Sequence, residues 1–299
     1  MRTAVIDLGT NTFNILIADV EGTNFKLVHT EKEGVALGKG GIHKNIISND
    51  AFERGKKTLR HFNFVCIHYR VERINAFGTS ALRGASNSKE FVDEVYDELG
   101  IKINIISGSK EAELIYNGVK LSYDFIKPAV IMDIGGGSTE FIFANNNGIS
   151  DMISLDIGIS RIYEHFKISN PAKKEEVFEV EKWLEETSDN FFDNKSEDIL
   201  IGASGTFETF YELIFNKSFP NTQNSIELPF DKLLSELNLI IFSTITERDK
   251  NEFLIPIRKK LAPIAAIKTR WVLNKLKVKK VYVSPCSLKE GAMLEGDLV

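Results

Sequence analysis

The sequence has few cysteines and no long uninterrupted run of apolar residues. Only Cys66 and Cys286 occur in 299 residues, and their wide separation gives neither metal-ligand nor redox-motif spacing. This excludes a disulfide framework, and two isolated thiols are typical of a reducing compartment. No uncharged stretch reaches the roughly 18 residues that a membrane helix requires. We therefore expect a cytoplasmic protein that neither spans nor binds a membrane.

A surplus of basic residues is also missing. The 37 Lys and Arg residues against 42 Asp and Glu give a net charge of −5, which argues against a dedicated nucleic-acid binder. Phosphate ligands remain allowed, because local charge governs their binding. Segment 258–280 is locally basic, with nine Lys or Arg and no acid. We interpret it as a solvated helix face, and the alternative is a track for a polyanion.

The length predicts about two domains. Apolar patterning predicts three strands at 3–8, 13–20 and 25–35 and then alternating helices and strands: helix 49–68, strand 73–79, helix 88–100, strand 101–107 and helix 109–121. The order then begins again, with strands 129–134, 138–145 and 148–157, followed by helices and strands 198–203 and 280–285. We expect an α/β protein with one domain at 1–124 and another at 125–299, whose last helix can pack back on the first.

The two halves also resemble each other in amino-acid sequence. VIDLGTNTFNILIA and IMDIGGGSTEFIFA both place an aspartate at the end of an apolar strand, followed by glycine and small polar residues. The aspartates, Asp7 and Asp133, are 126 positions apart. An internal duplication is the simplest explanation.

Two matching glycine-containing hairpins indicate phosphate binding. Glycine lets backbone N–H groups approach a phosphate without a Cβ in the way, while hydroxyl and amide side chains can donate to its oxygens. The alternative for either loop alone is an ordinary turn. The phosphate-binding candidates are Gly9, Thr10, Asn11, Thr12, Gly135, Gly136, Gly137, Ser138 and Thr139. Aspartates at the strand ends and Glu140 could hold Mg²⁺, which usually takes one or two carboxylates plus phosphates.

Paired hairpins of this kind resemble the actin and sugar-kinase superfamily. That resemblance implies two ribonuclease-H-like (actin-like ATPase) domains with an interdomain cleft. Further motifs resemble the Ppx/GppA phosphatase family (exopolyphosphatase and guanosine pentaphosphate phosphohydrolase) in its short two-domain form. They are IDLGTNTFNILIA, GTSALRGASN, IISGSKEAELIYNGV, DIGGGSTEF, GASGT, the Glu-Arg pair at 247–248 and VSPCSLKEGAML. The sequence departs from the family at Glu113, at 258–260 and at Lys289, which leaves substrate preference open.

The resemblance implies roles for single residues. Glu111 falls on the glutamate that activates the attacking water, and Arg83 on an arginine that binds phosphate and stabilises charge. From the residues alone, Glu111 could instead be a first-turn acid that suits the helix dipole, and Arg83 a surface ion-pair partner. Gly205 and Thr206 are further phosphate-binding candidates, although Thr206 could serve only as a helix cap. The metal candidates are Asp133, Glu140 and Asp7.

The expected activity is Mg²⁺-dependent release of terminal orthophosphate from polyphosphate, from guanosine pentaphosphate (pppGpp), or from both. The expected partners are these substrates or guanosine tetraphosphate, without nucleic acid or membrane, and a homodimer is one open assembly state. The alternatives are a small-molecule kinase on the same fold and a nucleotide sensor that binds without turnover. The five histidines show no metal-ligand spacing and are interpreted as surface or packing residues.

Overall fold

The computed structural model describes residues 1–22, 24–254 and 256–295 of an α/β protein built around two mixed sheets. The chain divides into two compact units. The first unit contains Met1–Gly118, the short segment Gly135–Gly137 and the C-terminal segment that begins at Cys286. The second contains Val119–Ile134 and Ser138–Pro285. The glycines of the second hairpin thus belong to the first unit, although their neighbours in the chain belong to the second.

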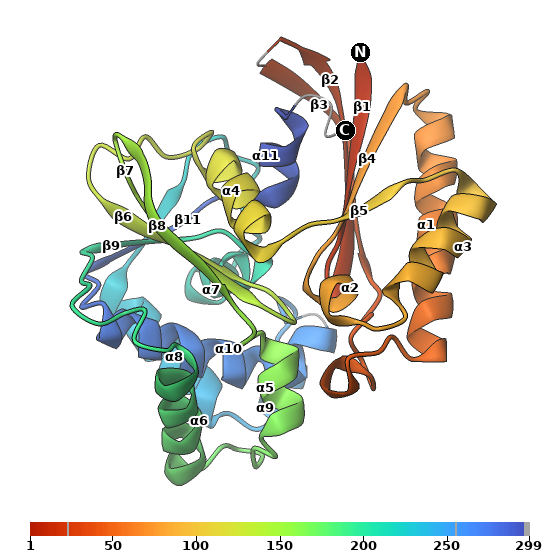
Figure 1. The fold of residues 1–299 in the computed structure, drawn as a ribbon. Helices are drawn as coiled ribbons and strands as arrows, with labels where there is room; N and C mark the ends of the chain where they lie inside the picture. The colour runs from red at the N-terminus through yellow and green to blue at the C-terminus, as the bar shows by residue number, and fades with distance from the viewer. Residues whose placement is uncertain (23, 255, 296–299) are drawn as a thin grey trace. The chain divides into compact units, whose positions relative to one another are not determined.

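The first unit is a five-stranded sheet with helices on both faces (Figure 1). Its strands run in the order β3-β2-β1-β4-β5, with β1 parallel to β4 and antiparallel to β2. Helices α1 and α3 lie on one face, and the C-terminal helix α11 packs on β1 and β2. The strands are β1 Arg2–Leu8, β2 Thr12–Glu21, β3 Asn24–Gly34, β4 Arg73–Gly78 and β5 Ile103–Ile105; the helices are α1 Asn49–His68, α2 Ser80–Gly84, α3 Ser88–Leu99, α4 Gly108–Val119 and α11 Leu288–Met293, with a short 3-10 turn at Ile42–Lys44.

The second unit has a six-stranded sheet in the order β10-β11-β9-β6-β7-β8. Helix α10 is its central helix and packs against α5, α6, α8 and α9. The strands are β6 Ala129–Ile134, β7 Thr139–Asn145, β8 Gly148–Leu155, β9 Ile199–Gly202, β10 Ile226–Leu228 and β11 Lys280–Val283; the helices are α5 Ile159–His165, α6 Lys174–Thr187, α7 Gly205–Phe215, α8 Phe230–Phe242, α9 Ile245–Asp249 and α10 Pro256–Lys275.

The duplication predicted from the letters is present in the topology. Each unit begins with three antiparallel strands, and its first strand then pairs in parallel with the strand after the first helical segment. Both sheets therefore share the βββαβ plan of a ribonuclease-H-like unit, and the predicted fold class is confirmed. Patterning did not detect α2 or β10, which are too short to show a period.

The interpretation of segment 258–280 as a solvated helix face was wrong. Helix α10 contributes a continuous buried set to the core of the second unit, including Ile264, Ala266, Ile267 and Val272. Even Lys268 is fully buried. The charge count of the segment gave no sign of this burial, because the residues that face the core are the alanines and isoleucines between the basic residues. Among the described residues, no helix has the length and apolar character needed to cross a membrane.

Candidate phosphate-binding and catalytic site

The first glycine loop is a tight turn between β1 and β2. Gly9 N donates to Thr12 O at 3.0 Å and closes the turn. A Cβ on Gly9 would lie 2.8 Å from that same oxygen, so this position requires glycine. The carbonyl of Asn11 accepts from Val35 N and Ala36 N, at 3.0 and 2.8 Å. The segment directly after β3 thus fixes the backbone of the loop.

The second glycine loop approaches the first one closely. A Cβ on Gly136 would lie 2.7 Å from Asn11 Nδ2, and a Cβ on Gly137 would lie 2.7 Å from Thr10 Oγ1. Distances below 3.0 Å leave no room for a side chain. The structure therefore brings Gly136 and Gly137 close to Thr10 and Asn11.

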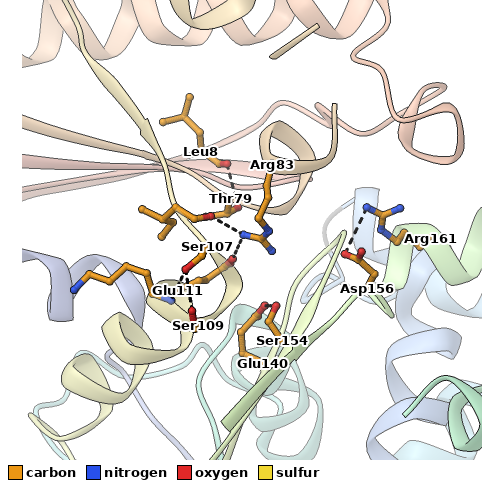
Figure 2. Close-up of polar contacts among 12 residues, drawn as sticks. Leu8, Thr79, Arg83, Ser107, Ser109, Glu111, Glu140, Ser154, Asp156 and Arg161 are labelled. Carbon is orange, nitrogen blue, oxygen red and sulfur yellow. Dashed lines mark hydrogen bonds and ion pairs between the residues drawn. The ribbon is translucent and has the colours of Figure 1, made fainter. Parts of the chain in front are cut away.

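Ser80 completes this contact, although sequence reasoning did not select it. It begins α2, and its Oγ lies 2.5 Å from the position of a Cβ on Gly137. The preceding Thr79 donates from its backbone and its hydroxyl to Leu8 O, at 3.3 and 3.2 Å (Figure 2). This anchor ties the start of α2 to the end of β1, directly before the first glycine loop.

The two hairpins place equivalent polar pairs beside their loops. In the first, β1 and β2 set Asp7 opposite Asn14, and Asn14 Nδ2 donates to Asp7 Oδ2 at 3.0 Å. Burial raises the pKa of Asp7 to about 6, and the Asn14 hydrogen bond opposes this shift. In the second hairpin, β6 and β7 set Asp133 opposite Glu140. The second hairpin therefore carries two carboxylates at the positions where the first hairpin carries a carboxylate and an amide.

Glu140 is 1% exposed and is held from two directions. Ser154 Oγ donates to Glu140 Oε1 at 2.6 Å (Figure 2). Lys268, fully buried on α10, donates to Thr139 Oγ1 at 2.6 Å and to the carbonyl of Ile157. Burial lowers the pKa of Lys268 to about 7, and the charge of Glu140 opposes this shift. The start of β7 is thus supported by a buried cation that the charge pattern of the sequence did not reveal.

The two predicted catalytic residues form a pair. Arg83 Nη1 donates to Glu111 Oε2 at 2.9 Å and to Ile106 O at 3.1 Å (Figure 2). Glu111 is 7% exposed and lies in the first turn of α4. A charge-assisted hydrogen bond of this kind orients the carboxylate. Glu111 is also the first-turn acid of the alternative interpretation and Arg83 is an ion-pair partner, so the catalytic roles of both stay predictions.

Helix α4, which carries Glu111, is positioned by α11. A Cβ on Gly118 would lie 1.9 Å from Ser287 O, and a Cβ on Gly291 would lie 1.9 Å from Leu114 O. The two helices can approach this closely only because each presents a glycine to the other's backbone. Near the other end of α4, Lys110 Nζ donates to Glu295 Oε1 at 2.6 Å. The C-terminal motif therefore supports the helix that holds the proposed base.

Gly205 and Thr206 begin α7 in the second unit. The preceding Ser204 accepts a hydrogen bond through its Oγ from Ile134 N at 3.3 Å. This contact ties the start of α7 to the last residue of β6, which is followed directly by the glycines 135–137. A role of Gly205 and Thr206 in phosphate binding stays a prediction.

A magnesium ion fits Asp133 and Glu140 better than Asp7. The described residues contain no group of three His, Cys, Asp or Glu that could hold a metal without other ligands. Mg²⁺ does not need such a group, because it usually keeps waters and takes substrate phosphates together with one or two carboxylates. Opposed carboxylates on adjacent strands repel each other, so a cation would relieve this repulsion. Asp7 faces the amide of Asn14 instead of a second carboxylate, so the first hairpin offers a cation one acid where the second offers two.

The fold and the paired loops define a protein of the actin-like class with two ribonuclease-H-like units. The profile of the Ppx/GppA phosphatase family matches residues 16–297. An exopolyphosphatase from Cytophaga hutchinsonii has a similar structure, with a TM-score of 0.94 at 33% sequence identity over 98% of each chain. The PPX-GPPA enzyme of Aquifex aeolicus has a TM-score of 0.81 at 25% identity, over 98% of this chain and 99% of that chain.

Curated relatives lead to the same family. A bifunctional 3-dehydroquinate synthase/phosphatase from Fusobacterium nucleatum is 33% identical over 309 residues, which are 98% of this chain and 46% of that protein. A guanosine-5'-triphosphate,3'-diphosphate pyrophosphatase from Pseudoalteromonas translucida is 32% identical over 215 residues, 71% of this chain and 43% of that protein. The chain spans about half the length of the curated relatives it matches. This protein belongs to the Ppx/GppA phosphatase family.

Proposed function

We propose that this protein is a Mg²⁺-dependent phosphohydrolase that releases terminal orthophosphate from inorganic polyphosphate, from pppGpp, or from both. The observation that carries the proposal is the close approach of the glycines 136–137 to Thr10 and Asn11. Two hairpin loops without intervening side chains offer backbone and side-chain donors to one phosphoryl group. Membership of a phosphatase family supports hydrolysis rather than phosphoryl transfer to a small acceptor.

In the proposed reaction, Glu111 orients a water molecule and accepts its proton as the water attacks the terminal phosphorus. Arg83 has two roles: it holds the Glu111 carboxylate and it presents positive charge where the phosphoryl oxygens gain negative charge. Loops 9–12 and 135–139 fix the phosphoryl group in line with the water. This positioning is the main contribution of a protein to phosphoryl transfer.

Asp133 and Glu140 would hold the magnesium ion, which supplies charge neutralisation to the phosphate oxygens when it is bound. The role of Glu140 depends on its support by Ser154 and on the Lys268–Thr139 contact beside it. These contacts keep the carboxylate and the start of β7 in place without a ligand, so binding need not order them.

The proposal is tested by phosphate release from long polyphosphate, tripolyphosphate and pppGpp in the presence of Mg²⁺. Glu111→Gln is expected to lower kcat by roughly 10²–10⁴, the usual contribution of a general base. Glu113→Gln is the matched control, because Glu113 lies on the same helix and pairs with Lys110 at 3.2 Å. We expect it to stay within about threefold of wild type.

Two results would contradict the proposal. Equal release by wild type and Glu111→Gln would remove Glu111 as the base. No release from any of the three substrates, together with tight calorimetric binding of pppGpp, would favour the nucleotide sensor instead. Comparing the three substrates also measures the preference between polyphosphate and pppGpp.

A further inference from the structure

The hydroxyl of Ser80 is one of three buried side-chain atoms without a hydrogen-bond partner among the described residues; the others are Thr3 Oγ1 and Glu295 Oε2. Ser80 is 4% exposed. Proteins rarely leave a buried hydroxyl unsatisfied, because it has lost its hydrogen bonds to water without replacement. Such a group in a folded protein calls for an explanation, and a ligand that arrives later is one.

The surroundings of Ser80 Oγ identify the kind of ligand. A Cβ on Gly137 would lie 2.5 Å from Ser80 Oγ and 2.7 Å from Thr10 Oγ1. The two hydroxyls thus face the same side of one glycine, the side from which a side chain would project. A ligand oxygen cannot occupy the Cβ position while Gly137 is in place, because that position lies within bonding distance of Gly137 Cα. Once Gly137 moves aside, an acceptor between the two hydroxyls can bond to both at the usual 2.5–3.0 Å. A phosphoryl oxygen is such an acceptor, and its negative charge strengthens the bond.

We propose that Ser80 is a phosphate-binding residue that donates from Oγ to the phosphoryl group held by the two glycine loops, next to Thr10. The proposal rests on the proposed function for its substrate, but the unsatisfied hydroxyl is an independent observation. The backbone just before Ser80 is fixed, because Thr79 donates to Leu8 O from its amide and its hydroxyl. In this conformation Gly137 covers Ser80 Oγ, so the phosphate meets the hydroxyl when the glycine loop moves outward.

This role predicts opposite effects on stability and activity. Ser80→Ala removes an unsatisfied buried polar group, so the free energy of unfolding should stay the same or rise. The same change removes a donor to a charged oxygen. We expect kcat/KM for tripolyphosphate to fall about 10- to 100-fold, which corresponds to about 1.4–2.7 kcal/mol at 1.36 kcal/mol per tenfold. A residue with a purely structural role would lose activity and stability together.

Thr3 provides a matched control within the same unit. Its hydroxyl is also buried and without a partner. It lies four residues before Asp7 on β1, roughly 13 Å along the strand at 3.3 Å per residue, and no glycine loop is described against it. Thr3→Val should leave kcat/KM within about twofold of wild type. A loss in Thr3→Val equal to that in Ser80→Ala would overturn the inference.

A binding experiment separates this inference from the proposed function. Calorimetry with tripolyphosphate and Mg²⁺ compares Glu111→Gln with Glu111→Gln/Ser80→Ala, so that turnover does not disturb the measurement. We expect about tenfold weaker binding in the double variant. If wild type releases no phosphate but the double variant still binds more weakly, the proposed function fails and the role of Ser80 stands. Equal binding by both variants, with unchanged kcat/KM for Ser80→Ala, would refute the role of Ser80.

Discussion

The two hairpins that carry the glycine loops share one register but differ in the residue opposite the aspartate. The first pairs Asp7 with the amide of Asn14, whereas the second pairs Asp133 with the carboxylate of Glu140. In the first pair the Asn14 amide donates to Asp7, and burial raises the pKa of this single acid to about 6. The second pair carries two acids on adjacent strands. The two hairpins thus share one scaffold but differ at this single position, and the proposed function places the magnesium ion at the second hairpin only.

The loops between the strands differ in the same way. The first is Gly-Thr-Asn, with side chains at its tip, while the second is Gly-Gly-Gly, with its first side chains only at Ser138 and Thr139. The difference has a steric reason, because a Cβ at 136 or 137 would collide with Asn11, Thr10 or Ser80. One loop must be bare for the other to present its side chains. Four predictions test this division of roles.

The largest effect is expected from Glu140→Gln. Even outer-shell partners of a metal change affinity or activity by 10–100-fold, so loss of a proposed ligand should lower kcat/KM by at least about 100-fold. It should also raise the Mg²⁺ concentration needed for half-maximal activity. Asn14→Ala, at the equivalent position of the first hairpin, should cost less than about tenfold. Equal losses in both variants would show that the hairpins do not divide their roles in this way.

Next is Gly137→Ala, which places a methyl group against Ser80 Oγ and Thr10 Oγ1. Because both contacts would fall below 3.0 Å, either the two hydroxyls must rotate away or the loop must shift, and we expect a 10- to 100-fold loss of kcat/KM. Gly34→Ala is the control, since a Cβ there meets nothing within 4 Å and φ is not positive. Steady-state kinetics with tripolyphosphate measures both variants. An active Gly137→Ala would mean that the loops need not meet.

Asp7→Asn should stabilise the protein near neutral pH. The pKa of Asp7 is raised from 3.8 to about 6 in the folded state, so the folded protein binds a proton that the unfolded chain has lost between these values. This favourable contribution is present below about pH 4 and is lost as the pH rises through 6. At pH 7.5 the free energy of unfolding of the variant should be about 3 kcal/mol higher than that of wild type, at 1.36 kcal/mol per pKa unit.

Measuring the stability of both proteins at two pH values tests whether ionisation of Asp7 causes the difference. Denaturant unfolding at pH 4 should show little difference between Asp7→Asn and wild type, because Asp7 is then largely protonated in the folded protein. A stabilisation of equal size at both pH values would point to packing rather than to the charge of the carboxylate. The same experiment on Asp133→Asn extends the comparison to the second hairpin.

The smallest effect is expected from Lys268→Met, which removes the cation behind Thr139 but keeps the volume of the side chain. KM for tripolyphosphate should rise several-fold as the start of β7 loses its anchor. Stability should be unchanged or higher, because replacing a buried charge by an apolar group of similar size is often neutral or favourable. Arg270→Met is the control on α10, since Arg270 bonds Glu181 and Asn238 instead. A large loss of stability with unchanged KM would make Lys268 a structural residue only.

The sequence by itself determined the α/β class, the duplicated order of strands and helices and the identity of the two glycine loops. Those features are local: strand and helix periods, turn residues and a repeated run of letters are all read within about 20 positions. Helix α1 over 49–68 and the strand at 129–134 were predicted to the residue for the same reason.

Only the tertiary structure decided which residues meet. Three contacts show this. Arg83 and Glu111 are 28 positions apart in the sequence, Ser80 and Gly137 are 57 apart, and Thr139 and the buried Lys268 are 129 apart. The sequence offered a serine directly after a predicted strand and a lysine in a basic segment, and neither residue type is unusual there. What makes them special is the loss of water around them, and burial depends on packing from distant parts of the chain.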